Sequence, residues 1–512
     1  DFNKEQYVNF LKSISYIVDK KEDFKINTSN VDKEISSIAG PQLVVRGDDG
    51  RYAIDVANAR WGSLYDGVYV TDVMSGEKGK GHNKERANKV ISYVREFLDQ
   101  VFPLNAGSWK EISKIQIEGN DLLLLIKEKK NYLKDKKIIT GEFYSLLIFA
   151  LLGCFIIISS NNLIVLFLGI ELSSLSLYSL IALNRSSILS SEAAIKYFVL
   201  STIASGIILF GFSYLYGITG TLSISDISKY LISYDESNLY LFSYVLIFIG
   251  VAFKFAVAPF HMWLPDVYEG SPLPITNFIA SIPKIAFFVL TYRFLEDNPI
   301  INNDNFSKLL LLLGIFSILV GNLFALAQKK IMRMLAYSGV ANAGFIFLGI
   351  FSAINNNFSI AAFYVISYAV TIVSAISIVT FISSKKFDLI YINDFKGFSS
   401  RSGYVSILLM ITLLSTAGIP LTIGFYAKYL VLDALVDRGL ILAAVVVVLM
   451  TVIGLYYYLR VIWFMFFESG SNSLINVRGN FSLFILSLIP ASIILVFLFP
   501  DSIFKHVFEI LT

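Results

Sequence analysis

The class of structure is set by residues 252–288, which read AFKFAVAPFHMWLPDVYEGSPLPITNFIASIPKIAFF. This stretch joins two apolar segments through a turn rich in proline, and each segment contains a lysine, Lys254 in the first and Lys284 in the second. A charged side chain near the centre of a bilayer costs about 2.5–3.5 kcal/mol on insertion scales, so a chain keeps one there only when it is paired, hydrated or used. The stretch therefore indicates a membrane protein with charges inside it.

Apolar segments of similar length recur on both sides of this stretch. A helix needs roughly 17–25 apolar residues to cross a bilayer. Eleven spans are predicted, at 143–160, 163–183, 193–217, 241–260, 275–296, 308–326, 331–353, 358–383, 404–434, 440–467 and 481–499. The fold class is therefore an all-α polytopic membrane protein over residues 143–499, and a tail follows at 500–512.

The start of the chain has a different composition. The whole sequence of 512 residues is 55% hydrophobic and 16% charged, with a mean hydropathy of +0.66, yet more than half of its charged residues precede position 143. Residues 1–126 are predicted to be a small, partial α/β soluble segment, and residues 127–142 a basic linker. The segment has helical patterns at 4–19 and 85–101, strand-like PQLVV and RYAIDVA around the turn at 47–50, and a solvated glycine-rich loop at 77–86 without P-loop or Rossmann spacing.

Charge and cysteine content exclude several functions. A net charge of +3, with no basic block on an aromatic surface, argues against nucleic-acid binding. The single cysteine, Cys154, lies in an apolar run, so we expect no disulfide and no cysteine-rich metal or iron–sulfur site within the chain. Any redox centres are expected in partners. The chain begins at Asp1 without an apolar run, which predicts no signal peptide and fits a truncated or excised product.

The distribution of Lys and Arg between alternate loops predicts the orientation. One side collects the run from Lys127 to Lys137 and then Arg185, Lys329, Lys330, Arg333, Lys385, Lys386, Lys396, Arg401 and Arg478; the other holds Lys229, Lys308, Arg438 and Lys505. The first side is predicted to be cytoplasmic. The soluble N-terminal segment would then lie in the cytoplasm as well.

Four ionisable residues inside predicted spans stand out: Glu171, Lys254, Lys284 and Lys428. For Lys254, near a helix end, the alternative is that its stem extends the ammonium to the interface. For Glu171 and Lys284 the alternative is a buried ion pair, which seldom stabilises more than an apolar core does. We interpret the four as a proton relay, in which a Glu171–Lys254 pair that opens and closes switches the lysine between holding and releasing a proton.

His261, in the turn after the fourth span, is predicted to connect this relay to water, and the alternative is that it satisfies local backbone groups. Pro259, Pro283 and the run Gly418-Ile419-Pro420 place helix breakers beside the lysines, which indicates a hydrated interior. If the first ten spans form two units of five, 143–296 and 308–467, Lys254 and Lys428 each fall on a fourth helix. Because five is odd, the units would be inverted repeats, followed by a final helix at 481–499.

The quoted stretch, with LFLGIELSSLSLYSLIALNRSSILSSEAAIKYFVLS at 166–201 and GIPLTIGFYAKYLVL at 418–432, closely resembles subunit N of bacterial NADH:quinone oxidoreductase, the counterpart of mitochondrial subunit 2, over residues 131–512. The resemblance implies proton translocation through Glu171, Lys254, Lys284 and Lys428, driven by quinone reduction elsewhere in respiratory complex I. It also implies an inner-membrane location, other membrane-arm subunits as partners, and FMN, iron–sulfur clusters and quinone bound by those partners. Bacterial members have fourteen spans, so the first three are expected to be missing.

The N-terminal segment resembles the early part of malate synthase G over residues 1–126, through FKINTSNVDKEISSIAGPQLVV, RYAIDVANARWGSLYDGVYVTD and REFLDQVFPL. This resemblance implies acetyl-CoA contacts at Val44, Arg51 and Tyr52. The catalytic arginine, the Mg²⁺-binding carboxylates and the catalytic aspartate of that family have no counterpart here, so no malate synthase activity and no metal site are expected.

Three alternatives to a complex I subunit stay open. The chain could be a stand-alone or Mrp-type cation/proton antiporter, since such proteins share the fold. It could be an acetyl-CoA-dependent enzyme tethered to a membrane. Finally, the abrupt change of resemblance between Leu125 and Asn131 is also what a gene fusion, or an erroneous joining of two genes, would produce.

Overall fold

The computed structural model describes residues 42–47 and 50–55 by their backbone, and residues 141–184, 187–232, 238–296, 298–353, 358–383, 390–469 and 480–498. Several predictions lie outside these residues: the helices at 4–19 and 85–101, the loop at 77–86, the linker up to residue 140, the tail at 500–512, and the loop charges Arg185, Lys385, Lys386, Arg478 and Lys505. The strands and the helices after Ser145 belong to separate compact units, each described by itself.

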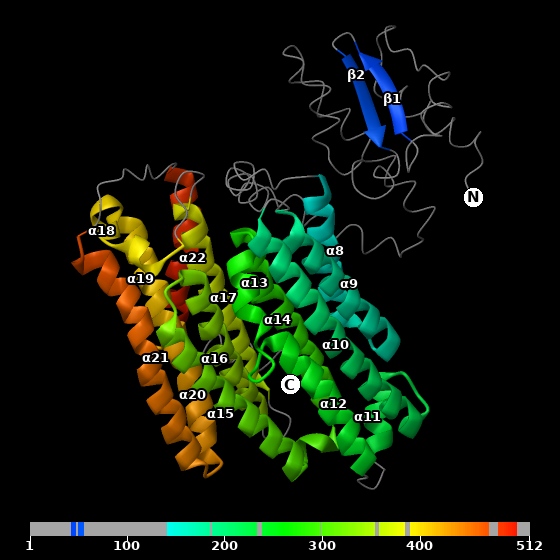
Figure 1. Cartoon of the computed structure of the whole chain (residues 1–512). Helices are drawn as coiled ribbons and strands as arrows, with labels where there is room; N and C mark the ends of the chain where they lie inside the picture. The colour runs from blue at the N-terminus through cyan, green and yellow to red at the C-terminus, as the bar shows by residue number, and fades with distance from the viewer. Residues whose placement is uncertain are drawn as a thin grey trace. The chain divides into compact units, whose positions relative to one another are not determined.

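The described part of the first unit includes an antiparallel pair of strands, β1 (Gln42–Gly47) and β2 (Gly50–Asp55), drawn in blue in Figure 1. Gly47 faces Gly50 in the register, so the connection contains two residues. Two-residue connections are the commonest in β-hairpins. The strand prediction on either side of the 47–50 turn is therefore confirmed.

The second unit is helical (Figure 1). Nine of its described helices are long and apolar enough to cross a membrane: α8 (Gly141–Ser159), α9 (Leu163–Ala182), α10 (Ile188–Thr219), α12 (Asn238–Phe255), α14 (Leu273–Leu295), α15 (Asp304–Ala327), α16 (Ile331–Phe351), α17 (Ser359–Ile382) and α21 (Ile441–Phe467). The others are α11 (Ile224–Ile232), α13 (Trp263–Gly270), α18 (Phe398–Arg401), α19 (Gly403–Ala417), α20 (Ile423–Asp437), α22 (Asn480–Leu498), and the 3-10 helices η1 (Pro299–Asn302) and η2 (Ile392–Phe395). The chain is a multi-pass membrane protein, as predicted.

Local sequence explains where these helices begin and end. The side chain of Asn162 accepts hydrogen bonds from the first amides of α9, and Ser187 does the same for α10. Such caps satisfy amides that have no partner within the helix. At its other end α10 stops at Gly220, whose left-handed backbone suits a residue without a side chain. The predicted spans therefore agree with the helices to within a few residues.

Two of the predicted spans are broken. The fourth ends as α12 at Phe255, before its predicted end at 260, and the short helix α13 begins beyond it at Trp263, while the ninth is divided into α19 and α20 around Gly418, Ile419 and Pro420. Both breaks were expected from the proline and glycine positions. Pro283, in contrast, lies inside the continuous helix α14. The expectation of a break there is wrong, because a proline removes a single amide donor and membrane helices tolerate it where neighbours fill the gap.

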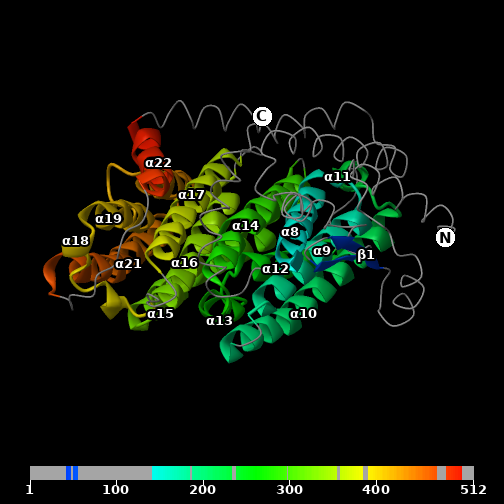
Figure 2. The ribbon, with the colours of Figure 1, turned by 90° about the horizontal axis from the view of Figure 1, so that it is seen from above.

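The elements fall into two sets of five crossings. The first set is α8, α9, α10, the broken helix α12–α13, and α14; the second is α15, α16, α17, the broken helix α19–α20, and α21 (Figures 1 and 2). In each set the fourth crossing is the broken one. An odd number of crossings places the second set in the opposite orientation.

Helix α16 lies at the centre of the second set, and every residue in it except Arg333 is buried. It packs on α15 through small residues, since a Cβ atom added to Gly344 would lie 2.6 Å from the carbonyl oxygen of Gly314. Close backbone approach at small residues is how helices pack within membranes. Helices α10 and α21, in contrast, expose many large apolar side chains, as expected for outward faces in a bilayer.

Candidate functional site

Lys254 lies in the last turn of α12, beside the first break, and is 6% exposed. Its Nζ donates hydrogen bonds to the hydroxyl oxygens of Ser174 on α9 and Ser201 on α10, both at 2.7 Å. Three helices of the first set thus meet at one ammonium group. The side chain stays inside the protein, so the alternative in which Lys254 extends to the interface is not what the structure shows.

Glu171 lies on α9 one turn before Ser174. Its Oε1 atom is buried and has no hydrogen-bond partner among the described residues. The ion pairs within the described chain do not include one between Glu171 and Lys254. The structure therefore shows the two charges apart, and a pair that opens and closes stays a prediction.

Lys284 lies in the middle of α14 and is 3% exposed. Its Nζ is 3.2 Å from the hydroxyl of Tyr368 on α17 and 3.4 Å from the carbonyl oxygen of Gly339 on α16. The ammonium also lies 4.5 Å from the centre of the Tyr368 ring, in cation–π geometry. Lys284 therefore connects the first set of helices to the second.

Lys428 lies on α20, just after the second break. Its Nζ donates to the carbonyl oxygens of Thr416, at 2.8 Å, and Ala417, at 2.9 Å. These carbonyls belong to the last turn of α19, where no following amide is available to bind them. The break in the helix therefore supplies the acceptors for the lysine.

His261 lies between α12 and α13 and is 7% exposed. Its Nδ1 has no hydrogen-bond partner in the described chain, and its ring centre is 6.0 Å from that of Tyr337. His261 also has a hydrogen bond with the backbone of Pro259. The backbone contact agrees with a local structural role, while the unpaired Nδ1 is also what a connection to water would use.

Two cavities meet at Lys428, and both are also lined by Asn342 of α16. One extends along Asn322 and Tyr457, and the other extends to Tyr368, which contacts Lys284. Polar cavities of this kind can hold water that bridges side chains. The second cavity therefore reaches from Lys428 to Tyr368, whose hydroxyl contacts Lys284, whereas neither Lys284 nor Lys254 lines either cavity.

A group of polar residues around these cavities was not singled out from the sequence. The hydroxyl of Tyr364 donates to Asn342 Oδ1 at 2.7 Å, Asn342 Nδ2 donates to the carbonyl oxygen of Ser338 at 2.8 Å, and the Ser338 hydroxyl contacts that of Tyr458. Tyr and Ser are too frequent in this chain to stand out. The spacing of Ser338 and Asn342 could have indicated this group, because residues four apart lie on the same face of a helix.

The predicted acetyl-CoA contacts lie on the hairpin of the first unit. Val44 faces Ala53, Arg51 faces Arg46 and Tyr52 faces Val45 in the register. The three positions therefore lie close together on two paired strands. Their role in binding acetyl-CoA stays a prediction.

Two inverted sets of five crossings, each with a broken fourth helix that carries a lysine, define a membrane protein of the antiporter-like class. A family model described as NADH:quinone oxidoreductase/Mrp antiporter, transmembrane, matches residues 160–454. The NADH-quinone oxidoreductase subunit N of Acidithiobacillus ferrooxidans is 40% identical over 389 residues, which cover 76% of this chain and 81% of that protein. The chain belongs to the NADH-quinone oxidoreductase subunit N family.

Solved structures agree with this assignment. A chain of respiratory complex I from Thermus thermophilus, with bound aureothin, is similar with a TM-score of 0.63 and 30% identity, over 72% of this chain and 80% of that one. A chain of the Mrp complex from Dietzia gives a TM-score of 0.62 at 20% identity, over 71% of this chain and 76% of that one. The second likeness shows the fold alone.

At the other end of the chain, a family model described as malate synthase G, alpha-beta insertion domain, matches residues 82–141. The predicted resemblance of the N-terminal segment to malate synthase G is therefore confirmed at the level of family. The match lies after Val44, Arg51 and Tyr52 in the sequence. It therefore adds no support for their assignment as acetyl-CoA contacts.

Proposed function

We propose that this chain is a membrane-arm subunit of respiratory NADH:quinone oxidoreductase that translocates protons through Glu171, Lys254, Lys284 and Lys428. The observation that carries the proposal is the set of contacts made by the three lysines, of which Lys254 and Lys284 are buried and Lys428 is half-buried. Each ammonium binds neutral oxygen atoms, and none forms an ion pair within the described chain. Burial disfavours a charged ammonium, and no carboxylate in contact holds the proton in place.

The cavity that extends from Lys428 to Tyr368, whose hydroxyl contacts Lys284, supports the transfer step. Water in this cavity would let a proton move between Lys284 and Lys428, whose side chains do not touch. Because the groups interact, their titrations would be coupled, and no single pKa would belong to one residue. Opening and closing of a Glu171–Lys254 pair would start the series of proton transfers, and His261 would connect the relay to water.

The rest of the proposal concerns what surrounds the chain. FMN, the iron–sulfur clusters and the quinone are held by partner subunits, and this chain performs no redox chemistry and needs no metal of its own. Its partners are other membrane-arm subunits, lipid, protons and water, with no nucleic acid. It lies in a bacterial inner membrane with its N-terminal segment in the cytoplasm, a placement supported by the basic residues on one side.

The N-terminal segment is proposed to be a remnant without malate synthase activity, joined to the membrane part by fusion or by an erroneous joining of genes. Two measurements test this. Sequencing across the codons for residues 120–140, with detection of one 57.3 kDa protein, would establish the fusion. Malate formation by the full chain would contradict the absence of activity.

The experiment for the main proposal is proton translocation by the complete complex in proteoliposomes. Lys254→Ala and Glu171→Ala are expected to lower the number of protons moved per NADH oxidised. Lys308→Gln, at a side chain that is 69% exposed, is the control and should leave the number unchanged. Equal translocation by all four proteins would refute the relay.

A stand-alone or Mrp-type antiporter is the second candidate, and the shared fold is the observation that favours it. If the chain is an antiporter, it should exchange protons for cations across an imposed gradient when it is alone in proteoliposomes, without a redox partner. Membership of the subunit N family favours the first candidate, which predicts co-purification with other membrane-arm subunits.

A further inference from the structure

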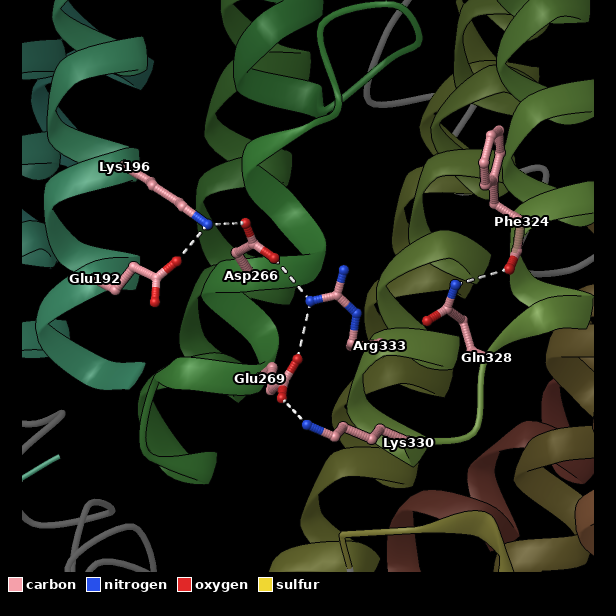
Figure 3. A network of polar contacts seen from close by, with 8 residues as sticks. All are labelled: Glu192, Lys196, Asp266, Glu269, Phe324, Gln328, Lys330 and Arg333. Atoms are coloured by element: carbon pink, nitrogen blue, oxygen red, sulfur yellow. Dashed lines mark hydrogen bonds and ion pairs between the residues drawn. The ribbon is translucent and has the colours of Figure 1, made fainter. Parts of the chain in front are cut away.

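A line of ion pairs connects the two sets of helices at one end of the bundle (Figure 3). It consists of six residues that alternate in charge, and we call it the ion-pair chain: Glu192, Lys196, Asp266, Arg333, Glu269 and Lys330. Lys196 Nζ is 2.6 Å from Glu192 Oε1 and 2.8 Å from Asp266 Oδ2. Arg333 Nη1 is 2.7 Å from Asp266 Oδ1 and 2.9 Å from Glu269 Oε2, which in turn pairs with Lys330.

The two carboxylates in the middle belong to α13, which lies between α10 and α16 (Figure 2). Lys196 comes from α10 in the first set of helices, whereas Arg333 comes from α16 in the second. Some ion pairs between described residues join the first set of helices to the second, and all of these are part of the ion-pair chain. Its charges therefore link α10 to α16 through α13.

On the side of α10, the link lies next to the contacts of Lys254. The ring of Tyr197, which follows Lys196, stacks on Trp263 of α13 with their centres 4.4 Å apart. One turn further along α10, Ser201 accepts the hydrogen bond from Lys254. A shift of α13 along α10 would therefore disturb the place where Lys254 is held.

On the side of α16, the same helix contacts the other two lysine sites. Arg333 lies in its first turn, Gly339 offers its carbonyl oxygen to Lys284, and Asn342 lines both cavities at Lys428. A shift of α16 would therefore move two groups together: the Gly339 carbonyl oxygen that accepts from Lys284, and the Asn342 side chain that lines the cavities at Lys428. The ion-pair chain joins the helix that holds Lys254 to the helix that serves Lys284 and Lys428.

The pairs at α13 are partly buried, with side-chain exposures of 28% for Asp266 and Arg333 and 14% for Glu269. Partial burial and shared hydrogen bonds make such pairs stronger than isolated surface pairs. Burial alone would raise the pKa of both carboxyls, but their bonds to Lys196, Lys330 and Arg333 outweigh it and lower the pKa. Both groups are therefore charged at neutral pH.

The geometry points to a positioning role for the ion-pair chain: it fixes the register of α16 against α10, and so keeps the three lysine sites aligned for proton transfer. The register is a property of the fold itself. Its consequence for proton transfer rests on the proposed function. Arg333 is the residue to test, because it alone bridges both carboxylates of α13.

The register is tested by the distance between two spin labels in the purified complex. The labels replace Ile195 on α10 and Leu323 on α15, which are 64% and 50% exposed, in a Cys154→Ser background. Arg333→Gln is expected to broaden or shift the distance distribution, and Arg333→Lys, which keeps the charge, is expected to restore it. Lys308→Gln removes a charge from an exposed pair on α15 and should change nothing. An unchanged distribution in Arg333→Gln would overturn the inference.

The second readout is the number of protons moved per NADH oxidised, at equal amounts of assembled complex. Arg333→Gln is expected to lower this number at least about twofold, and Arg333→Lys to recover most of it. If Lys254→Ala lowers the number while Arg333→Gln does not, the relay stands and the positioning role is refuted. If Lys254→Ala has no effect, the proposed function fails, and the label distances alone decide whether the ion-pair chain sets the register.

Discussion

At the scale of single residues, the three lysines of the site differ in the groups that bind them. Lys254 and Lys284 contact hydroxyls, of Ser174, Ser201 and Tyr368, whereas the hydrogen bonds of Lys428 go to two carbonyl oxygens. A hydroxyl can accept from an ammonium and donate to a neutral amine, but a carbonyl only accepts. The hydroxyl contacts therefore suit a lysine that alternates between its charged and neutral forms.

Tyr368→Phe tests this difference. The change removes the hydroxyl beside Lys284 and keeps the ring, so we expect proton translocation to fall several-fold while the complex still assembles. A hydrogen bond to a charged group contributes about 1.5–3 kcal/mol, which is enough to alter a transfer rate strongly. Tyr404→Phe, at an exposed tyrosine, is the control. Normal translocation by Tyr368→Phe would show that this hydroxyl takes no part.

Acid should weaken the ion-pair chain. The pKa values of Asp266 and Glu269 are lowered from ordinary values of 3.8 and 4.5, so both carboxylates stabilise the fold above those values. The contribution is lost as the pH falls through the lowered values, because the unfolded chain then binds more protons. The double variant Asp266→Asn, Glu269→Gln is expected to be less stable at neutral pH by about 1 kcal/mol per carboxylate. Thermal unfolding of the complex from about pH 7 to about pH 3, below both ordinary pKa values, should show the stability difference between the unmodified protein and the double variant narrowing. A constant difference over this range would contradict the prediction.

The sequence predicts the charged residues of the site better than the neutral ones. Glu171, Lys254, Lys284 and Lys428 stand out because a charge in an apolar span is costly. Ser174, Asn342 and Tyr368 do not stand out, because a hydroxyl or amide in a membrane helix can satisfy itself locally. Which of them contacts a lysine depends on how helices far apart in the sequence pack together.

At the scale of elements, the breaks in the two fourth helices determine where the lysines lie. The break after α19 leaves carbonyl oxygens free for Lys428, and it is made by Gly418 with a φ of +85°. A Cβ atom at Gly418 would lie 2.8 Å from Cδ of Lys428. The turn and the lysine therefore occupy adjoining space.

Gly418→Ala should lower proton translocation more than a loss of stability explains. A side chain at positive φ costs roughly 1–2 kcal/mol, and here it would also displace the stem of Lys428. Gly439→Ala is the matched control: its φ is +73°, and no atom lies within 4 Å of the added Cβ. Both variants should lose similar stability in thermal unfolding. Equal proton translocation by the two would contradict a role for the Gly418 turn in placing Lys428.

Most of the elements follow from the sequence, and the exceptions have physical reasons. Apolar length predicts the spans, Pro259 predicts the break at 256–262, and Gly418 with Pro420 predicts the break at 418–422. The short helix α13 was not predicted as a separate element, because its contacts with α10 and α16 lie far away in the sequence. Pro283 was expected to interrupt α14 and does not.

At the scale of the whole molecule, the inverted arrangement of the two sets follows from the count of crossings and predicts a defined orientation. Lys308 lies near the start of α15 and Lys329 just after its end; both are exposed, and they lie on opposite sides in the proposed orientation. In a Cys154→Ser background, Lys308→Cys should react with an impermeant maleimide from outside the cell. Lys329→Cys should react only after the membrane is opened. The reverse pattern would show that the orientation is inverted.

The measurement that tests the central claim most directly is the number of protons translocated per NADH oxidised by the reconstituted complex with Lys284→Ala. Lys284 links the two sets of helices through Tyr368 and Gly339, so a relay through this chain must pass it. We predict a complex that assembles with its partners and moves fewer protons per NADH than the unmodified one. An assembled complex with an unchanged number would contradict proton translocation through this chain.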